Sequence, residues 1–415
     1  MMAGRRGARL VRGWMGLALA AGLATGLAAC ADDEEAPAQE PEAEPEGQPE
    51  AQPEAQPEPE PEPSEARFAT YNVGLARGFV DFAEERAQPL ADALAGMDAD
   101  VVCLQEVWDD DFITLMTDGT KANFPHSYFE KTFSDERVAG CTDEEIAPLE
   151  ACAIKNCDGV EPGELAGCVL GACGEEFRAT STECQGCAAT QLGKPLEEII
   201  AACRGGGPAF SYGGHNGLVI LSRHPLSDTG HAEFVSSLVF RAALHATIEH
   251  PEVGKVDIYC THLAADLSAS IEYQGELGSF AAEQAQEIDE MAAFIEDTQS
   301  GGLQLVMGDF NNGPAKGSCS AELPENFQKI LDLGYVSPYA DQAAPTCTFQ
   351  ENNTLVGGEG DGGQILEHIF VKAEASARVG SVSRIFDALT TISTGGGDRE
   401  LNLSDHFGVQ VVILP

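Results

Sequence analysis

The sequence predicts a layered domain of interleaved strands and helices, of the α/β or α+β class, that begins near Arg67. Short apolar runs of strand length recur along residues 67–415, and helical and loop segments separate them. One helix is evident from its period, because the apolar side chains between Glu276 and Ile295 follow one face. With roughly 350 residues, this part of the chain is long enough to bury a large core.

Eight runs are predicted to be strands because they are short, apolar and rich in β-branched residues. They are residues 67–72, 101–105, 217–221, 243–248, 256–261, 303–307, 365–371 and 408–414. A second helix is expected between Arg86 and Met97. Strands and helices that alternate in this way favour sheets covered by helices.

Residues 134–208 lack strand alternation and are predicted to be an insertion between elements of the core. Eight of the 13 cysteines crowd into it: Cys141, Cys152, Cys157, Cys168, Cys173, Cys184, Cys187 and Cys203. An even number of closely spaced cysteines in an exported chain indicates a disulfide framework, whose pairing the sequence does not reveal. Zinc is the alternative, because Cys184 and Cys187 have the spacing of zinc ligands, but the segment has no histidine and no second such pair.

Four other cysteines fall in the predicted core. Cys319 and Cys347 are a candidate pair. Cys103 and Cys260 lie within predicted strands, and we expect them to be buried thiols, since free cysteine behaves as a small apolar residue.

The N-terminus has the parts of an export signal. Four arginines precede an apolar run at residues 14–28, and small residues then lead to Cys30. This arrangement resembles a bacterial lipoprotein signal, which implies removal of residues 1–29, acylation of Cys30 and a membrane-anchored, extracytoplasmic protein. An ordinary secretory signal is the alternative. Residues 31–66 hold 14 acidic residues and many prolines but no Lys or Arg, so residues 30–66 are predicted to be a disordered tether.

The charge is strongly negative, with 68 acidic against 23 basic residues and a net charge of −45. The acidity extends to residues 67–415, which hold 54 acidic and 19 basic residues. The charge therefore disfavours binding to nucleic acid through the surface of the whole chain, because phosphate binding needs basic surface. Nucleic acid remains open as a substrate. Arg223 and Lys316 are the basic residues near the motifs described below that are candidates for contact with a substrate phosphate.

Polar residues recur where the predicted strands end, and a packed scaffold can present such residues to a shared cleft. They are Asn72, Glu106, His262, Asp309 with Asn311, Glu367 with His368, and Asp405 with His406. A single Asn or Asp at a strand end is explained by turn formation. Six such positions in chain order indicate a common site.

The motifs at these positions are Thr70-Tyr-Asn72, Leu104-Gln-Glu106-Val, Asn216-Gly-Leu-Val-Ile-Leu-Ser222, Thr261-His262-Leu, Gly308-Asp309-Phe-Asn311, Leu366-Glu367-His-Ile-Phe and Ser404-Asp405-His406-Phe. In this order they resemble the endonuclease/exonuclease/phosphatase superfamily, which includes deoxyribonuclease-like nucleases, bacterial neutral sphingomyelinases and inositol-phosphate phosphatases. The resemblance covers residues 67–415 apart from the insertion. It implies a four-layer sandwich of two packed mixed β-sheets with helices outside.

The resemblance also implies a metal-dependent phosphoesterase. Mapped by motif, Glu106 is the principal Mg²⁺ ligand, Asn72 lies beside it, and Asp405 completes the site. Hard oxygen ligands suit Mg²⁺, and Mn²⁺ or Ca²⁺ are alternatives.

The same mapping assigns the catalytic residues. His406 is the general base for the attacking water, and Asp309 orients that water or shares the base role. His262, Asn311 and Asn216 donate hydrogen bonds to phosphate oxygens as negative charge develops.

One residue departs from the pattern that the resemblance implies. The family usually has Asp where this chain has Glu367, and that residue orients the catalytic histidine. Glutamate keeps the charge but adds a methylene, so the geometry around His406 must adjust. No metal ligand is lost.

Three functions compete. The first is a Mg²⁺-dependent phosphodiesterase that acts on a lipid head group or another small phosphoester, like the sphingomyelinases. The second is an extracellular metal-dependent endonuclease, which the acidic composition disfavours. The third is a non-catalytic surface lipoprotein, which is disfavoured because the metal and base positions remain chemically competent. We expect a monomeric enzyme of the first kind.

Overall fold

The structure is a computed structural model that describes residues 65–131, 138–160, 162–189, 191, 194–208, 211–269, 273, 275–350, 352–356 and 362–415. The predicted signal peptide, Cys30 and nearly all of the predicted tether lie outside the described residues. Within the described ranges, no helix combines the length and the apolar character needed to cross a membrane.

Two six-stranded mixed sheets form the centre of the domain. The first contains, in spatial order, β13 (Val379–Ile385), β16 (Gly408–Ile413), β1 (Ala66–Asn72), β2 (Val101–Gln105), β6 (Val219–Ser222) and β3 (His126–Tyr128). The second contains β11 (Tyr335–Val336), β12 (Glu367–Lys372), β10 (Leu303–Asp309), β9 (Gly254–His262), β8 (Ala242–His250) and β7 (Ser227–Glu233). One pair in each sheet is parallel, β1 with β2 and β9 with β10.

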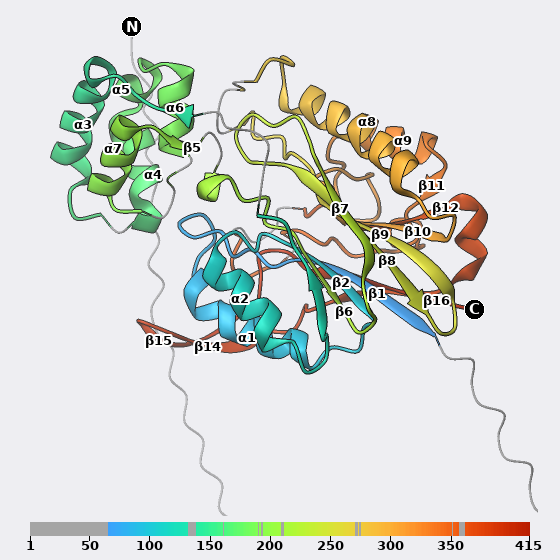
Figure 1. The fold of residues 1–415 in the computed structure, drawn as a ribbon. Coiled ribbons are helices and arrows are strands. Elements are labelled where there is room, and N and C mark those ends of the chain that lie inside the picture. The colour runs from blue at the N-terminus through green and yellow to red at the C-terminus, as the bar shows by residue number, and fades with distance from the viewer. Residues whose placement is uncertain are drawn as a thin grey trace, which may run out of the picture. The chain divides into compact units, whose positions relative to one another are not determined.

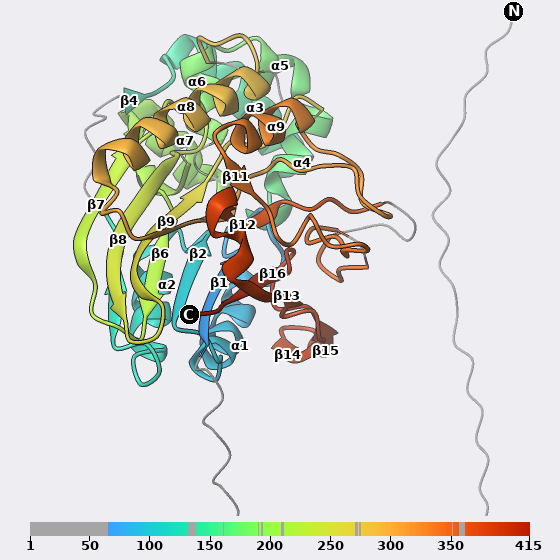
Figure 2. The ribbon, with the colours of Figure 1, turned by 90° about the vertical axis from the view of Figure 1, so that its right-hand side faces the viewer.

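The sheets pack face to face because their strands are apolar on both sides. Along β1, Phe68 points into the core between the sheets, while Ala69 and Tyr71 belong to the core on the other face. That outer face is covered by α1 (Ala83–Ala95) and α2 (Asp110–Gly119). The outer face of the second sheet is covered by α8 (Phe280–Thr298) and α9 (Pro324–Asp332). The predicted four-layer sandwich is therefore confirmed, and Figures 1 and 2 show the helices on the two outer sides.

Each of the eight predicted strands overlaps an observed one, and both predicted helices are present. The helix expected from Glu276 begins at Phe280, because the Ser279 hydroxyl accepts the backbone N–H of Ala282 at 3.1 Å and caps it there. The prediction lacked four strands of the two sheets, β3, β7, β11 and β13, and the hairpin of β14 (Thr390–Thr394) and β15 (Gly397–Leu401). Most residues of these strands are at least partly exposed, so their sequences carry little apolar alternation.

The cysteine-rich insertion, residues 138–208, is helical. Its two ends pair as the short strands β4 (Val138–Ala139) and β5 (Gly207–Pro208). Between them lie α3 (Asp143–Cys157), α4 (Pro162–Ala172), α5 (Gly174–Arg178), α6 (Thr182–Ala189) and α7 (Leu196–Gly205). Figure 1 shows these helices, in green, as a group of their own.

The predicted disulfide framework of the insertion is confirmed. Its eight cysteines form four bridges, Cys141–Cys184, Cys152–Cys173, Cys157–Cys168 and Cys187–Cys203. The zinc alternative is wrong, because the two cysteines with zinc-ligand spacing belong to different bridges.

In the core, Cys319 and Cys347 are bonded, as the sequence suggested. The expectation of two buried thiols is wrong. Cys103 of β2 and Cys260 of β9 form a disulfide with their Cα atoms 5.4 Å apart. These strands belong to different sheets, so the bond joins the two sheets through the core, and only the packing of the sheets brings the two residues together.

Candidate active site

The polar residues at the strand ends meet where the two sheets adjoin. Because β1 runs parallel to β2 and β9 to β10, Asn72 and Glu106 lie at the carboxyl end of one pair, and His262 and Asp309 at that of the other. The amide nitrogen of Asn72 donates to Oδ2 of Asp309 at 2.9 Å. This hydrogen bond connects the two sheets at the site.

A cavity of about 430 Å³ lies at this edge. The predicted site residues that line it are Glu106, His262, Asp309, Asn311, Asp405 and His406. Asn72 and Glu367 are bonded directly to lining residues, Asn72 to Glu106 and Glu367 to His406. Residues from both sheets and from the loop before β16 thus converge on one cavity.

Glu106 has a left-handed backbone, with φ of 61°. For a residue with a Cβ this conformation costs of order 1–3 kcal/mol, so the surrounding structure must hold it. The Asn72 amide donates to Glu106 Oε1 at 3.1 Å, and the next residue, Val107, donates its N–H to Gly217 O at 2.9 Å. Burial, and then the charge of Asp405, raise the pKa of the Glu106 carboxyl.

Asp405 approaches the backbone of Gly74 closely. A Cβ added to Gly74 would lie 2.2 Å from Asp405 Oδ1, and the φ of Gly74 is +54°. Both facts require glycine at this position. Ser404 fixes the same loop, since its hydroxyl donates to Asn72 O at 2.7 Å.

His406 and Glu367 form a buried hydrogen-bonded pair, with 2.5 Å between Nδ1 and Oε1. Glu367 is fully buried, and the extra methylene of glutamate still allows this contact. Burial works against a charged imidazole, but the carboxylates of Glu367, Asp405 and Asp309 outweigh it and hold the pKa of His406 well above its ordinary value. Nδ1 is therefore committed to Glu367, and Nε2 is the ring nitrogen left for proton transfer.

His262 has the opposite electrostatics. Burial, Arg241 and His406 all lower its pKa well below the ordinary value, so the ring is neutral. Asn311 Nδ2 lies 3.1 Å from His262 Nε2 and donates to Leu263 O at 2.9 Å. With Nε2 as acceptor, the proton is on Nδ1, which is buried and has no hydrogen-bond partner in the described part of the chain. Asn311 thus orients His262 as a hydrogen-bond donor.

Asn216 lies beside the Glu106 segment through the Val107–Gly217 hydrogen bond. Its Oδ1 accepts the N–H of Leu218 at 3.0 Å, and its Nδ2 is buried without a partner among the described residues. A buried unpaired amide donor is costly, and a bound acceptor would satisfy it.

The structure does not bring Arg223 to the site. β6 runs antiparallel to β2, so Ser222 pairs with Val101 at the start of β2, and Arg223 follows at the far end of that strand from Glu106. Five strand residues separate the two ends, a distance of about 17 Å. There the Arg223 guanidinium binds Asp98 at 3.0 Å and Asn123 at 3.1 Å. Lys316 is not among the residues that line the cavity either.

Arg241 takes the place that the sequence analysis gave to Arg223. It lines the cavity, is 6% exposed, and faces the charges of Glu287, Glu106 and Asp309, which oppose the lowering of its pKa by burial. Its Nη1 is buried and finds no hydrogen-bond partner within the described ranges. The sequence contained a signal that could have identified Arg241, because this basic residue directly precedes a strand, β8. Arg223, in contrast, directly follows the strand β6.

Two buried side chains that the sequence analysis did not single out hold the loops of the site. Arg86 of α1 donates to Val73 O at 3.1 Å and to Leu403 O at 2.6 Å, so it joins the loop after β1 to the loop before His406. Gln284 of α8 donates to carbonyls in the loops that follow β9 and β10. Each is a polar residue on an otherwise apolar helix face, and this feature of the sequence could have identified both.

The residues fit a hard divalent cation. Glu106 and Asp405 present carboxylates to one cavity, and their mutual repulsion, seen in the raised pKa of Glu106, is what a cation would relieve. Asn72 points Nδ2 at Glu106 while its oxygen accepts the N–H of Gly74 at 3.0 Å. In this geometry Asn72 orients the carboxylate, and it would serve as a ligand only with its amide reversed.

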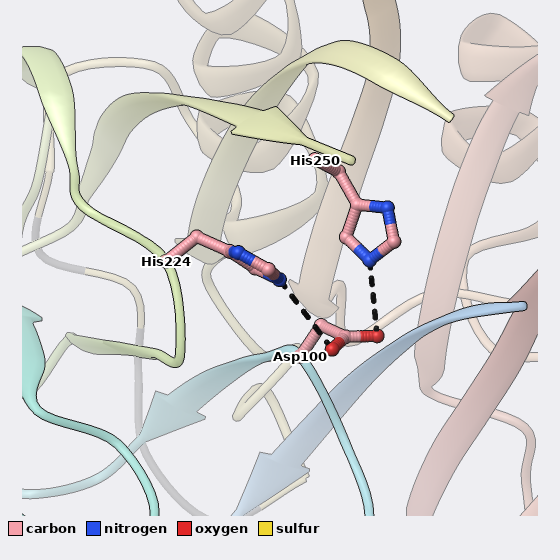
Figure 3. A group of neighbouring side chains, drawn as sticks. All are labelled: Asp100, His224 and His250. Carbon is pink, nitrogen blue, oxygen red and sulfur yellow. Dashed lines mark ion pairs between the residues drawn. The ribbon is translucent and has the colours of Figure 1, made fainter. Parts of the chain in front are cut away.

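A second His and carboxylate group, Asp100, His224 and His250, lies at the opposite end of the first sheet (Figure 3). Both rings point Nε2 at Asp100, at 3.5 Å from His224 and 3.6 Å from His250. His250 Nδ1 accepts the N–H of Glu252 at 3.2 Å, so Nε2 carries the proton and faces the carboxylate. A ring protonated on this side does not ligate a metal, and the group is explained by packing.

Comparisons with known proteins agree with this geometry. A sequence model of the Endonuclease/Exonuclease/phosphatase family matches residues 69–406. No match was found among curated proteins.

Two solved structures share the fold. SmcL is 15% identical with a TM-score of 0.50, over 84% of this chain and 99% of that one. Sphingomyelinase C from Streptomyces griseocarneus has the same identity, TM-score and coverage. At this identity the likeness concerns the fold, whereas the family match spans most of the chain and includes the residues at the ends of the strands. The chain therefore belongs to the endonuclease/exonuclease/phosphatase family, whose members are metal-dependent phosphoric ester hydrolases.

Proposed function

We propose that this enzyme is a Mg²⁺-dependent phosphodiesterase that acts on a lipid head group or another small phosphoester, as a sphingomyelinase does. The observation that carries the proposal is the Glu367–His406 pair, which faces the same cavity as the carboxylates of Glu106 and Asp405. A base with a fixed ring, next to two oxygen ligands, is the arrangement that metal-assisted hydrolysis of a phosphoester needs. Mn²⁺ and Ca²⁺ are alternative cations.

The residues divide the chemistry among them. Mg²⁺ held by Glu106 and Asp405 would offset the negative charge of the phosphate. A cation held by Glu106 and Asp405 would offset carboxylate charge that otherwise raises the pKa of His406, and so would favour its neutral ring. The neutral ring accepts the proton of the attacking water at Nε2, and Glu367 stabilises the imidazolium that results. The Nδ1–H of His262 and the guanidinium of Arg241 donate to phosphate oxygens. Asp309, 3.7 Å from His406 Nδ1, accepts the Asn72 amide and holds the two sheets in register at the site.

The charge of the cavity favours a small substrate over nucleic acid. Among the described residues that line it, Arg241 is the one Lys or Arg side chain, and it is buried. One buried guanidinium serves a single phosphate, whereas a polynucleotide needs basic residues along the path of its backbone.

A substrate panel tests this proposal. Sphingomyelin, phosphatidylinositides, double-stranded DNA and a chromogenic phosphodiester are compared with Mg²⁺, Mn²⁺, Ca²⁺ or EDTA, at low salt to favour any nuclease activity. We expect hydrolysis of the lipid and chromogenic substrates that EDTA abolishes and Mg²⁺ restores. His406→Ala should lower turnover by about 100-fold or more, as expected for the loss of a general base. Preferred cleavage of DNA would support the endonuclease instead, and no hydrolysis of any substrate would support the non-catalytic alternative.

We further propose that the enzyme is an extracytoplasmic lipoprotein anchored through Cys30. The support is the sequence alone: four arginines, an apolar run and small residues that end at Cys30, followed by a Pro- and Glu-rich segment. Cys30→Ser should release the protein from the membrane fraction. Continued membrane association of this variant would contradict acylation of Cys30.

A further inference from the structure

The cavity at the active site continues into the cysteine-rich insertion. Besides the polar residues described above, its walls include Leu149 of α3, Ala166 and Val169 of α4, and Ile199 of α7. Phe79 and Val239 line it from the sandwich side. The insertion and the sandwich therefore enclose one continuous space.

Polarity divides this space. The histidines, Arg241 and most of the carboxylates belong to the sandwich. The insertion contributes mainly apolar side chains and one carboxylate, Glu150, which is paired with Arg204 at 2.5 Å. Apolar side chains also remain exposed beside it, since Phe79 is 70% exposed and Leu170 of α4 is 46% exposed. Exposed apolar surface that adjoins a polar site is typical of a binding site for an amphiphile.

The disulfides explain how the insertion can keep such a space. A small group of helices would normally pack its aliphatic side chains against each other, which would close the cavity. Here Cys203 of α7 lines the cavity and is bonded to Cys187, while Cys141 at the start of the insertion is bonded to Cys184. Covalent bonds hold the helices in place, so the cavity is preformed and ligand binding costs less ordering.

We propose that the insertion binds the hydrocarbon chain of a single-chain amphiphilic phosphodiester whose phosphate lies at His262 and Arg241. The inference rests on the proposed function. It adds that one of the two groups esterified to the substrate phosphate is a single hydrocarbon chain. A volume of about 430 Å³ is in the range of a site for one small ligand, about 300–1,000 Å³, which favours one chain over the two chains of a bilayer lipid.

Binding is tested first, without catalysis. Trp108 lines the cavity, and the chain's one other tryptophan, Trp14, lies in the segment that the proposed signal processing removes, so Trp108 is the sole tryptophan reporter of the processed protein. Dodecylphosphocholine, titrated below its micelle concentration in EDTA, should give a saturable change in this fluorescence. Glycerophosphocholine, which has the same phosphodiester head group without the alkyl chain, should bind at least tenfold more weakly.

Two matched substitutions on α4 locate the chain. Ala166 lines the cavity, whereas Ala172 on the same helix is exposed and does not. Ala166→Phe should weaken dodecylphosphocholine binding at least tenfold, and Ala172→Phe should leave it unchanged. Circular dichroism checks that both variants fold. Absence of saturable binding, or an equal effect of the two substitutions, would overturn the inference.

Kinetics separates this inference from the proposed function. In a series of p-nitrophenyl alkyl phosphodiesters with Mg²⁺, kcat/KM should rise about fourfold for each added methylene until the cavity is full, which corresponds to about 0.8 kcal/mol. Ala166→Phe should abolish that rise, whereas Ala172→Phe should leave both the rise and the hydrolysis of the methyl ester unchanged. Hydrolysis that does not depend on chain length would overturn the inference and leave the proposed function intact. Binding of the hydrocarbon chain without hydrolysis of any ester would support the inference and contradict the proposed function.

Discussion

Among single residues, the proposed mechanism depends most on the contact between Glu367 and His406. Glu367 Oε1 lies 2.5 Å from His406 Nδ1, although its side chain is one methylene longer than the aspartate that the resemblance implies at this position. Glu367 starts β12 directly opposite Asp309 of β10, so a rigid strand pair fixes where its carboxylate begins. The backbone position of Glu367 is therefore fixed, and its longer side chain reaches the imidazole of His406 from that position.

Glu367→Gln should lower kcat by 100-fold or more. The amide keeps the shape but loses the charge that stabilises the imidazolium, and it can force the wrong tautomer on His406. Steady-state hydrolysis of a chromogenic phosphodiester gives kcat, and calorimetric titration should show unchanged Mg²⁺ affinity, since Glu367 is not among the proposed ligands.

Glu367→Asp is the informative companion variant. Aspartate is the residue that the resemblance implies at this position. In this chain the shorter side chain would leave a gap of about one methylene between its carboxylate and His406, so we expect kcat to fall roughly tenfold. Full activity of the glutamine variant would contradict the orienting role of Glu367.

At the scale of elements, α8 supports the active-site loops from behind. The Gln284 amide donates to Ala264 O at 2.6 Å, Phe310 O at 3.1 Å and Asn311 O at 3.2 Å. Its oxygen accepts the amide of Asn312 at 2.9 Å. One buried side chain therefore fixes both the loop after His262 and the loop that carries Asn311.

Gln284→Leu should destabilise the fold and slow the reaction together. Leucine fills a similar volume but leaves these buried carbonyls without donors, at a cost of about 1–3 kcal/mol in the free energy of unfolding. Urea unfolding measures the loss, and kcat should fall because the loops move. Gln286→Leu is the matched control on the same helix, because Gln286 is exposed and contacts Glu290 alone among the residues described. Equal effects of the two variants would contradict the role of Gln284.

Asp257 of β9 ties the second sheet to the turn after α8. Its carboxylate accepts hydrogen bonds from the hydroxyl of Thr247 at 2.9 Å and from the N–H of Ser300 at 2.8 Å, and the residue is fully buried. Burial alone would raise the pKa of Asp257, but His245, whose Nε2 lies 3.5 Å away, and the hydrogen bonds from Ser300 and Thr247 overcome it and lower the pKa to about 2. The ionised form is therefore favoured in the folded state.

The sign of the pH dependence follows. The pKa is lower in the folded chain than in the unfolded one, so the contribution to stability is complete above about pH 4 and is lost as the pH falls toward about 2. Asp257→Asn should lower the free energy of unfolding by about 2 kcal/mol at pH 7, and this difference should shrink below pH 4. Urea unfolding between pH 3 and 7 checks it, with the exposed Asp297→Asn as control. A difference that does not change with pH would contradict the assignment.

At the scale of the whole molecule, the Cys103–Cys260 disulfide joins the two sheets across 157 residues of sequence. Replacing both cysteines with alanine should lower the free energy of unfolding by about 2–5 kcal/mol, because the unfolded chain gains freedom. Guanidinium unfolding measures this loss, while kcat under native conditions should stay within about twofold, since neither residue lines the cavity. An unchanged midpoint would contradict a stabilising bond between the sheets.

Much of this fold and site could be predicted from the sequence because each signal was local. Asn72, Glu106 and Asp309 could be recognised since each lies where an apolar strand ends. What depends on direction or on packing could not be predicted. The strand direction of β6 removes Arg223 from the site, and the face-to-face packing of the sheets, which no local pattern encodes, pairs Cys103 with Cys260.

The extension of the cavity into the insertion is a further case. The sequence showed eight cysteines and aliphatic residues between them, which is equally typical of a self-contained helical module. Only the arrangement of α3, α4 and α7 beside the site shows that these residues line the same space as His262 and Asp309.

We propose that side chains from distant strands form one metal-dependent hydrolytic site. The decisive experiment compares the Mg²⁺ dependence of chromogenic phosphodiester hydrolysis in the wild-type enzyme and in Glu106→Gln, which keeps the shape of the side chain and removes its charge. EDTA should abolish wild-type activity, and the variant should need at least tenfold more Mg²⁺ for half-maximal rate or be inactive. Activity that persists in EDTA, or the same Mg²⁺ dependence in both proteins, would contradict this proposal.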